Sequence, residues 1–284
     1  MKALITGVKG QLGFEVCKRL DELHVKNRGV DLEDFDLTDA RQTMAAIVDE
    51  HPDCVIHCAA YTNVNKAQAD RAACFAVNVE GTRNVASACR EVGASMMLIS
   101  TDYVFNGQGE KPFLPDAPKA PLNVYGESKL MSEQIMSELL ERFYIVRTSW
   151  VFGHNGANFV KTMLRLGREK EQLSVVDDQI GSPTYARDLA ILLCELAQTN
   201  KFGVYHATNE GFCSWYEFAE EIMRLAGLPC KLMPVPTRDY PSPAERPLNS
   251  RLSKACLDAA GLERLPYWRD ALRRYLVEEH VEIG

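Results

Sequence analysis

A tyrosine stands four positions ahead of a lysine in the segment NVYGESKL, which spans residues 123–130. Four residues is slightly more than one helical turn, so Tyr125 and Lys129 share a face if this segment is helical. A phenol beside an ammonium can move a proton, because the cation favours the phenolate and lowers the pKa of the tyrosine. The same spacing also occurs on ordinary surface helices. Other residues of the chain must decide between these two interpretations.

Three glycines lie between the first predicted strand and the first predicted helix, in the segment TGVKGQLG of residues 6–13. Gly7 permits a tight turn, Gly10 lets the backbone approach a pyrophosphate, and Gly13 lets the helix pack close to the sheet. Their spacing is one residue longer than the G-x-G-x-x-G of many dehydrogenases. The alternative is that these glycines only form a turn, but their position in a βαβ unit favours dinucleotide binding. We expect this loop to contact a coenzyme through Gly7, Gly10, Gln11, Leu12 and Gly13.

An acidic residue near the end of the second strand of such a fold hydrogen-bonds the adenosine ribose, and Asp31 is the candidate here. Its carboxylate would repel a 2′-phosphate and so favour NADH over NADPH, whereas the nearby Arg28 would soften that preference. A solvated surface acid is the alternative interpretation of Asp31. We expect Asp36 and Leu37 to meet the adenine. The preference between NADPH and NADH stays open.

The stretch SMMLISTDYVF places two hydroxyl residues, Ser100 and Thr101, where a buried strand ends. The carboxyl ends of the strands in a doubly wound sheet face the crevice that binds ligands. Together with the glycine loop and the Tyr125/Lys129 pair, this arrangement resembles the extended branch of the short-chain dehydrogenase/reductase superfamily, which acts on nucleotide sugars. The resemblance implies that Thr101, Tyr125 and Lys129 are catalytic.

Alternating strands and helices in the first half of the chain must position these residues. The predicted strands are 2–6, 24–32 (weaker), 53–60, 95–100 and 143–150, and the predicted helices are 11–23, 39–50, 75–92 and 127–143. This alternation requires crossover connections and a parallel sheet with helices on both faces. The sequence therefore predicts an α/β protein with a doubly wound, Rossmann-type sheet.

The pattern changes after about residue 150, and a proline-rich passage at 232–250 reads as an ordered loop, since proline is excluded from sheet interiors. The other predicted elements here are helices 158–169, 184–198 and 214–227, and strands 173–178 and 204–209. We expect two interleaved domains. The NAD(P)-binding domain comprises residues 1–152 and the returning segment 184–207, and the smaller substrate domain comprises 153–183 and 208–284.

An ordered set of motifs spans nearly the whole chain: STDYVF, NVYGESK, RTSWVFG, NFVKTMLRL, LSVVDDQIGSPT, SWYEFA and RPLNSRL. The set resembles the dTDP-4-dehydrorhamnose reductase family, which reduces the 4-keto group of dTDP-4-dehydro-L-rhamnose in the last step to dTDP-L-rhamnose. The resemblance implies that Lys129, with Tyr125, contacts the nicotinamide ribose and that Thr101 hydrogen-bonds the ketone oxygen. Related dehydratases carry Asp-Glu after the hydroxyl residue, whereas this chain carries Asp102-Tyr103, so dehydration is not expected.

The same resemblance implies a set of residues around the substrate. Tyr103 and Trp150 would shape the sugar pocket, and Asn158 and Arg246 would bind the diphosphate, which suits the two parallel donors of a guanidinium. Trp150 as a core aromatic, Asn158 as a helix cap and Arg246 as a surface cation are the alternatives. The segment 58–68 would contact the coenzyme through Ala59, Ala60 and Tyr61, and the substrate through Thr62 and Val64.

The chain departs from the family pattern at several polar positions. Asn65 and Gln68 are neutral where the pattern usually has an acidic pair. Some members bind magnesium at a dimer interface through three glutamates; Glu15 matches one, Asp188 falls at the second, and the third has no secure counterpart. Magnesium is therefore possible but not supported, we predict no metal ligands, and a homodimer is possible.

Composition narrows the remaining classes of partner. A formal net charge of -7 argues against nucleic acid or an anionic membrane surface. No apolar stretch is long enough for a signal peptide or a membrane span, and nine cysteines without a C-x-x-C pair indicate reduced thiols in the cytoplasm. The leading hypothesis is an NAD(P)H-dependent nucleotide-sugar 4-ketoreductase acting on a dTDP-sugar. The alternatives are a related reductase or epimerase for another sugar nucleotide, and a non-catalytic NAD(P)-binding regulatory subunit.

Overall fold

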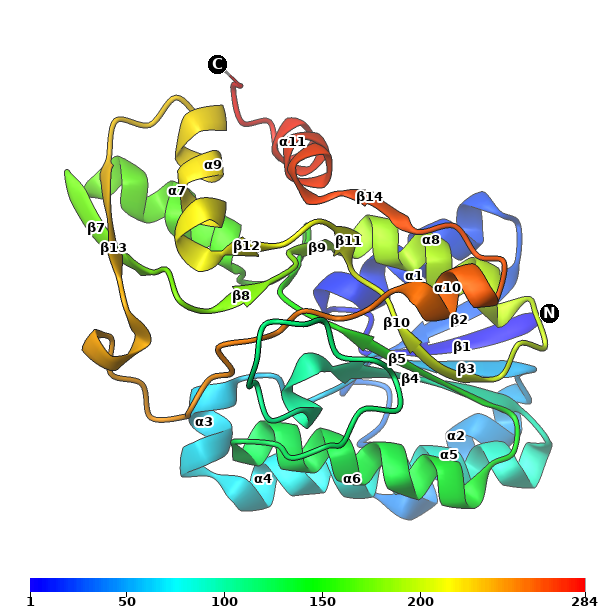
Figure 1. Ribbon diagram of the computed structural model, residues 1–284. Coiled ribbons are helices and arrows are strands. Elements are labelled where there is room, and N and C mark those ends of the chain that lie inside the picture. Colours follow the sequence, from blue (N-terminus) through cyan, green and yellow to red (C-terminus); the bar gives the residue numbers. More distant parts are fainter. Residues whose placement is uncertain (284) are drawn as a thin grey trace.

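A parallel six-stranded sheet forms the centre of the computed structural model, which describes residues 1–283 (Figure 1). The strands run in the order β10-β5-β4-β3-β1-β2, and every neighbouring pair is parallel. Their bounds are β1 Lys2–Thr6, β2 Lys26–Val30, β3 Cys54–His57, β4 Ser95–Thr101, β5 Phe143–Thr148 and β10 Gly203–His206. The predicted doubly wound α/β fold is confirmed.

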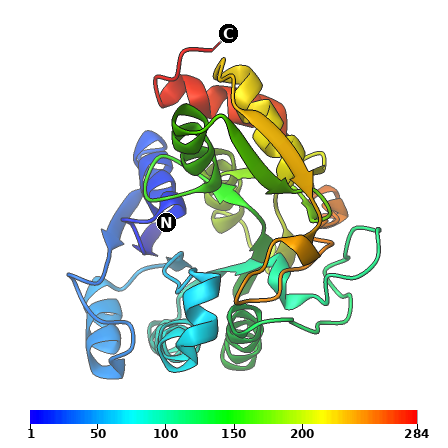
Figure 2. The same cartoon turned by 90° about the vertical axis from the view of Figure 1, so that its left-hand side faces the viewer.

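Helices cover both faces of this sheet (Figures 1 and 2). One layer contains α1 and α8, and the other contains α2, α5 and α6; their bounds are α1 Gln11–Glu22, α8 Ala186–Ala197, α2 Ala40–Glu50, α5 Gly81–Val92 and α6 Val124–Leu139. Alternate strand residues pack into the two layers, Ile5 and Ile56 into the first and Leu4 and Val55 into the second. Because both faces are buried, the central strands are apolar throughout rather than alternating with polar residues.

The region between β3 and β4 is more broken than the single helix predicted for 75–92. It contains α3 Val64–Ala69, α4 Arg71–Phe75, a π-helical turn (η1) at Ala76–Glu80, and then α5. The π-helical turn places Asn78 in the interior, where its side chain bonds the Tyr61 amide nitrogen (2.7 Å) and the Ser128 hydroxyl (2.8 Å). These bonds connect distant segments, so a local pattern could not reveal them.

The helix that carries the tyrosine and lysine begins at Val124, earlier than the predicted residue 127. Asn123 caps it, because its side-chain oxygen accepts a hydrogen bond from the Gly126 amide (2.9 Å). Tyr125 and Lys129 therefore both lie in regular helix, one turn apart on α6. The helical spacing that the sequence suggested is confirmed.

A second group of elements packs above the carboxyl ends of the sheet (Figure 1). It consists mainly of α7 Phe159–Glu169, α9 Trp215–Leu225, α11 Trp268–Glu278, β7 Gln172–Val176 and β13 Lys231–Val235. The prediction that 232–250 is entirely loop is wrong at its start, since β13 pairs in parallel with β7. This sheet has only two strands, so Pro234 sits on an edge strand where its missing amide hydrogen is tolerated.

The remaining elements are short, and some connect the two parts. They are η2 Asp102–Val104, β6 Val151–Phe152, β8 Ile180–Gly181, β9 Thr184–Tyr185, β11 Asn209–Glu210, β12 Cys213–Ser214, η3 Thr237–Asp239, α10 Ala255–Ala259 and β14 Leu265–Tyr267. Leu257, Leu262 and Leu265 pack into the core formed by α1, α8 and the sheet. This part of the segment assigned to a substrate domain therefore lies against the nucleotide-binding core, and the expected domain division stays a prediction.

Within residues 1–283 no helix is both long and apolar enough to cross a membrane.

Candidate active site

A cavity of about 840 Å³ opens over the carboxyl ends of the central strands, where doubly wound folds bind ligands. Thr6 at the end of β1, Thr101 at the end of β4 and Thr148 at the end of β5 all line it. All but two of the expected site residues lie in this lining: Gly7, Gly10, Gln11, Leu12, Gly13, Asp31, Asp36, Leu37, Ala59, Ala60, Tyr61, Thr62, Val64, Thr101, Tyr103, Tyr125, Trp150 and Arg246. Lys129 and Asn158 are the exceptions.

The glycine loop has the shape of a cradle for phosphate. Gly7 adopts a φ of 73°, and a Cβ added to Gly13 would lie 2.3 Å from the Gly7 carbonyl oxygen, so the turn excludes larger residues at both positions. The α1 helix follows directly, and its N-cap residue Gly10 provides no side-chain cap. The first amides of α1 therefore remain available to an anion, as a pyrophosphate requires.

The acidic residue expected at the ribose lies at the rim of the same cavity. Asp31 Oδ2 accepts a hydrogen bond from the Lys9 amide (2.9 Å), which ties the carboxylate to the glycine loop. Arg28 instead pairs with Glu50 (3.0 Å) and lies outside the cavity lining. The expected softening of coenzyme preference by Arg28 stays a prediction, with the guanidinium paired to Glu50 in the protein.

Asp31→Asn is expected to raise the preference for NADPH over NADH about fivefold, because it removes a charge that repels a 2′-phosphate but retains the side-chain shape. The measurement is the ratio of kcat/KM for the two coenzymes. Asp49→Asn is the control, since Asp49 is an exposed acidic residue of α2 outside the cavity lining and should leave the ratio unchanged. An unchanged ratio in Asp31→Asn would contradict the assignment of Asp31 to the ribose.

Thr101, Tyr103 and Tyr125 lie close together in the cavity lining. The rings of Tyr103 and Tyr125 meet edge to face with centroids 5.8 Å apart. The Thr101 hydroxyl donates to Asp102 Oδ1 (3.0 Å) and accepts from the Tyr103 amide (3.2 Å). Thr101 must therefore release Asp102 before it can donate to a ketone oxygen of a ligand.

Burial controls the charge states of the tyrosine and lysine pair. Lys129 is 2% exposed, and burial lowers the pKa of its ammonium to about 8, against an opposing effect of Glu133. Burial also raises the pKa of Tyr125, and interaction with the Thr101 hydroxyl only partly opposes this rise. The expected lowering of the Tyr125 pKa by Lys129 is not found in the protein chain alone, because desolvation of the phenolate outweighs the favourable interactions.

Asp102 lies in the lining beside Thr101, although the sequence argument used it only to weigh against dehydration. The residue is 3% exposed, and burial raises the pKa of its carboxyl to about 6. Its Oδ2 atom has no hydrogen-bond partner among the described residues. A buried polar atom without a partner is costly, so this oxygen is available to a donor on a ligand. Its position directly after Thr101 was the sequence signal that could have identified it.

An aromatic wall closes another side of the cavity. Trp150 has a φ of 50°, a left-handed conformation that is strained for a bulky residue. Its indole stacks on Trp215 with ring centroids 3.7 Å apart and planes at 13°. A Cβ at Gly181 would lie 2.8 Å from the Trp150 ring, so the stack needs a glycine there. Trp215, at the start of α9 in SWYEFA, is a lining residue that sequence reasoning missed.

Arg246 brings a positive charge to the cavity from the proline-rich segment. Its Nη1 donates to the Tyr103 hydroxyl (3.3 Å) and its Nη2 donates to Asn65 Oδ1 (3.2 Å). Both acceptors are neutral, and no ion pair within residues 1–283 involves this guanidinium. Arg246 is therefore a cation in the cavity lining that an anionic ligand can pair with.

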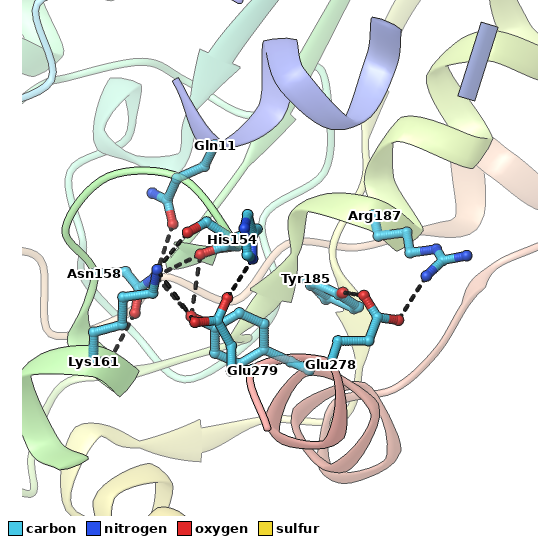
Figure 3. A network of polar contacts seen from close by, with 10 residues as sticks. Gln11, His154, Asn158, Lys161, Tyr185, Arg187, Glu278 and Glu279 are labelled. Atoms are coloured by element: carbon cyan, nitrogen blue, oxygen red, sulfur yellow. Dashed lines mark hydrogen bonds and ion pairs between the residues drawn. The ribbon is translucent and has the colours of Figure 1, made fainter. Parts of the chain in front are cut away.

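Asn158 lies beside the cavity rather than in its lining, within a polar network that reaches α11 (Figure 3). It caps α7 by accepting from the Lys161 amide (2.9 Å), as the helix-cap alternative proposed. Its Nδ2 donates to Gln11 Oε1 (3.0 Å) and to the Gly153 carbonyl (2.9 Å). Both polar atoms of the Asn158 side chain are thus hydrogen-bonded within the protein, and one of these bonds orients Gln11 of the glycine loop.

No group of three His, Cys, Asp or Glu side chains in residues 1–283 is arranged to hold a metal ion. Of the two positions compared with magnesium ligands, Glu15 is buried and burial raises its pKa. Asp188 pairs with Arg274 at 2.7 Å. An arginine thus already neutralises one of the two carboxylates.

The parallel doubly wound sheet, the glycine cradle, and a tyrosine and lysine on the helix beside a strand-end threonine define an extended short-chain dehydrogenase/reductase. The chain belongs to the family described as "RmlD substrate binding domain", whose model matches residues 1–281.

Comparisons with individual proteins agree with this family. The chain is 40% identical over 277 residues to the spore coat polysaccharide biosynthesis protein SpsK of Bacillus subtilis, covering 98% of this chain and 97% of SpsK. It is 41% identical over 276 residues to a dTDP-4-dehydrorhamnose reductase of Streptomyces griseus, covering 95% and 91%. A crystal structure of dTDP-4-dehydrorhamnose reductase from Bacillus anthracis in complex with NADP matches with a TM-score of 0.95 and 41% identity, covering 98% of this chain and 99% of that one.

Proposed function

We propose that this protein is an oxidoreductase that reduces the 4-keto group of dTDP-4-dehydro-L-rhamnose to give dTDP-L-rhamnose, with NADPH or NADH as the reductant. The observation that carries the proposal is the convergence of Thr101, Tyr125 and the glycine cradle on one cavity. The names of relatives that match over almost their whole length support the substrate, and the NADP complex of the Bacillus anthracis protein supports the coenzyme.

Each residue near the reacting carbonyl has a separate role in the proposed ketone reduction. A bound reduced nicotinamide supplies the hydride. Tyr125 donates the proton to the ketone oxygen, and the Lys129 ammonium on the next helical turn favours the phenolate that this leaves. The Thr101 hydroxyl turns from Asp102 to the same oxygen, and a donor of this kind is typically worth about 3 kcal/mol in the transition state.

The other lining residues suit a sugar joined to a nucleoside diphosphate. Trp150, backed by Trp215, offers an apolar face to the sugar ring. Arg246 carries the charge that a diphosphate needs, because a guanidinium can bond two phosphate oxygens at once. Tyr103 stands where a dehydratase carries a second carboxylate, so the cavity retains a proton donor for reduction but lacks that acid for elimination.

The test of this function mixes the purified protein with NADPH or NADH and dTDP-4-dehydrorhamnose, and follows the nicotinamide absorbance and the sugar product by mass spectrometry. Loss of absorbance with formation of dTDP-rhamnose supports the proposal. Turnover only with another dTDP-, UDP- or GDP-linked keto sugar would identify the related reductase instead. Coenzyme binding without turnover on any sugar would identify a regulatory subunit.

Arg246→Ala is expected to raise the KM for the sugar nucleotide about ten- to thirtyfold, because a charge-assisted hydrogen bond to phosphate is lost. The KM for the coenzyme should change little. Arg238→Ala is the matched control, since Arg238 lies on the same proline-rich segment, its side chain is 85% exposed, and it does not line the cavity. Equal KM values in wild type and Arg246→Ala would contradict the diphosphate assignment.

We further propose the cytoplasm as the compartment. Each of the nine cysteines is a free thiol, as is usual where thiols are kept reduced. A homodimer stays a prediction, and light scattering after size-exclusion chromatography measures it directly.

A further inference from the structure

A buried carboxylate lies one helical turn beyond Lys129 on α6. Glu133 is 4% exposed, and no ligand-binding role accounts for it because it lies outside the cavity lining. Arg147 pairs with it through two parallel bonds, from Nε to Oε1 (2.9 Å) and from Nη2 to Oε2 (2.7 Å). The Ser100 hydroxyl also donates to Oε1. Three donors therefore fix this carboxylate beneath the cavity.

The two residues that hold Glu133 are direct partners across neighbouring strands. Ser100 of β4 pairs with Arg147 of β5, and the next pair in the register is Thr101 with Thr148. Both residues of that next pair line the cavity. One carboxylate of α6 thus joins the helix to both strands at the position immediately before the strand ends that form the reacting site.

We propose that Glu133 is a positioning residue for the reduction: it holds the helix that carries Tyr125 and Lys129 against the strand end that carries Thr101, and it places a negative charge one turn from the Lys129 ammonium. This inference rests on the proposed catalytic roles of those three residues. Displacement of a catalytic group by about 1 Å can cost about a hundredfold in rate. The bonds from Glu133 to Ser100 and Arg147 act as a clamp between α6, which carries Tyr125, and the end of β4, which carries Thr101. Loss of this clamp should therefore lower turnover.

The electrostatic surroundings of Lys129 agree with this role. Its side chain forms no ion pair with any residue in the described chain, and burial lowers its pKa. Glu133 is the foremost of the groups that raise that pKa, followed by the thiols of Cys58 and Cys74. His57 also faces Lys129, and burial lowers the His57 pKa so that its ring is neutral. Glu133 is the carboxylate in this set, although Arg147 offsets part of its charge.

A purely structural role for the Glu133–Arg147 pair is the competing explanation, since removing one partner of a buried ion pair destabilises a fold in any case. The chain offers a matched control. Asp188 of α8 is 5% exposed and accepts two parallel bonds from Arg274 of α11 (2.7 and 2.8 Å). Neither residue lines the cavity. Asp188→Asn therefore breaks another two-bond pair away from the reacting site, in which the arginine is partly exposed and keeps its bond to Asp270.

The experiment compares wild type, Glu133→Gln, Glu133→Asp and Asp188→Asn by kcat, both KM values, the pH profile of kcat and thermal unfolding. Glu133→Gln is expected to lower kcat about ten- to thirtyfold with KM for the sugar nucleotide nearly unchanged. The alkaline limb of its kcat–pH profile, which we expect to report deprotonation of Lys129, should move to lower pH by about one unit. The reason is that the Lys129 ammonium loses the favourable interaction with the Glu133 carboxylate. Glu133→Asp should keep the limb in place, and Asp188→Asn should lower the unfolding temperature while leaving kcat and the limb unchanged.

A kcat for Glu133→Gln within threefold of wild type, with an unshifted limb, would overturn the inference. Equal losses of kcat in Glu133→Gln and Asp188→Asn would also overturn it. If Glu133→Gln cannot be purified, Arg147→Lys decides. Arg147 lies outside the cavity lining, and a lysine there keeps the charge but cannot make both parallel bonds to Glu133. It should lower kcat about three- to tenfold, and a wild-type kcat would reject the clamp. Absence of turnover in the wild type is a separate result that rejects the proposed function itself.

Discussion

Tyr125→Phe is expected to lower kcat by about two to four orders of magnitude, the range that general acid catalysis contributes. The substitution removes only the hydroxyl of that side chain. The ring still packs against Tyr103 and against the apolar cluster between α4 and α6. Because burial raises the pKa of Tyr125, the phenol is protonated across the physiological range and begins the reaction as a donor. Coenzyme affinity should stay within a few-fold of wild type, since the glycine cradle is untouched.

Steady-state kinetics measures the loss of turnover, and titration of NADPH fluorescence measures the affinity. Tyr205→Phe is a matched control, because Tyr205 is a buried tyrosine whose hydroxyl bonds the Lys201 carbonyl, and it lies outside the cavity lining. It should leave kcat within about twofold of wild type. If Tyr125→Phe retained turnover within a few-fold, another group, with Asp102 the first candidate, would have to supply the proton.

Gly13→Ala is expected to weaken coenzyme binding about a hundredfold or more, because overpacking against rigid backbone forces the structure to shift. The added Cβ would lie 2.3 Å from the Gly7 carbonyl oxygen and 2.8 Å from its carbonyl carbon. Relief of this clash requires either the glycine loop or the start of α1 to move. Both of those supply the amides that face a pyrophosphate. The loss should therefore appear in the dissociation constant of both NADPH and NADH.

Calorimetry or fluorescence titration measures this effect directly, without a need for the sugar substrate. Gly81→Ala is the control, since Gly81 begins α5, where alanine favours the helix. The nearest atom to a Cβ there is Leu37 Cβ at an ordinary 3.4 Å. This variant should bind coenzyme as the wild type does. Wild-type affinity in Gly13→Ala would show that the loop does not hold the coenzyme phosphates.

The neutral side chain at position 65 bears on the charge available for substrate. Asn65 stands where the family pattern usually has an acid, and its amide oxygen accepts from Arg246 and from the Ser242 hydroxyl. A carboxylate there would pair with the guanidinium and compete with a diphosphate for it. The departure from the pattern therefore leaves the Arg246 guanidinium with a neutral acceptor at position 65 instead of an ionic partner.

Local sequence determined the parts of this protein that depend on neighbouring residues. Glycines after a buried strand dictate a tight turn into a helix, and the spacing of Tyr125 and Lys129 sets a common helical face, since helix geometry repeats every 3.6 residues. Apolar strands alternating with helical patterns likewise determined a parallel, doubly wound sheet, because short crossovers permit few other arrangements. These features needed no knowledge of distant contacts, and the structure contains them.

Only the tertiary structure decided the features that depend on segments far apart in the chain. Glu133 meets Ser100 and Arg147 because the sheet register aligns those two strands beneath α6. Trp215 reaches Trp150 only because α9 folds over the cavity, and the same long-range packing commits Asn158 to Gln11. The direction in which the Tyr125 pKa shifts was likewise decided only by the tertiary structure. Its spacing from Lys129 suggested a lowered pKa, but desolvation is a property of everything that surrounds the phenol, and that is known only once the chain has folded.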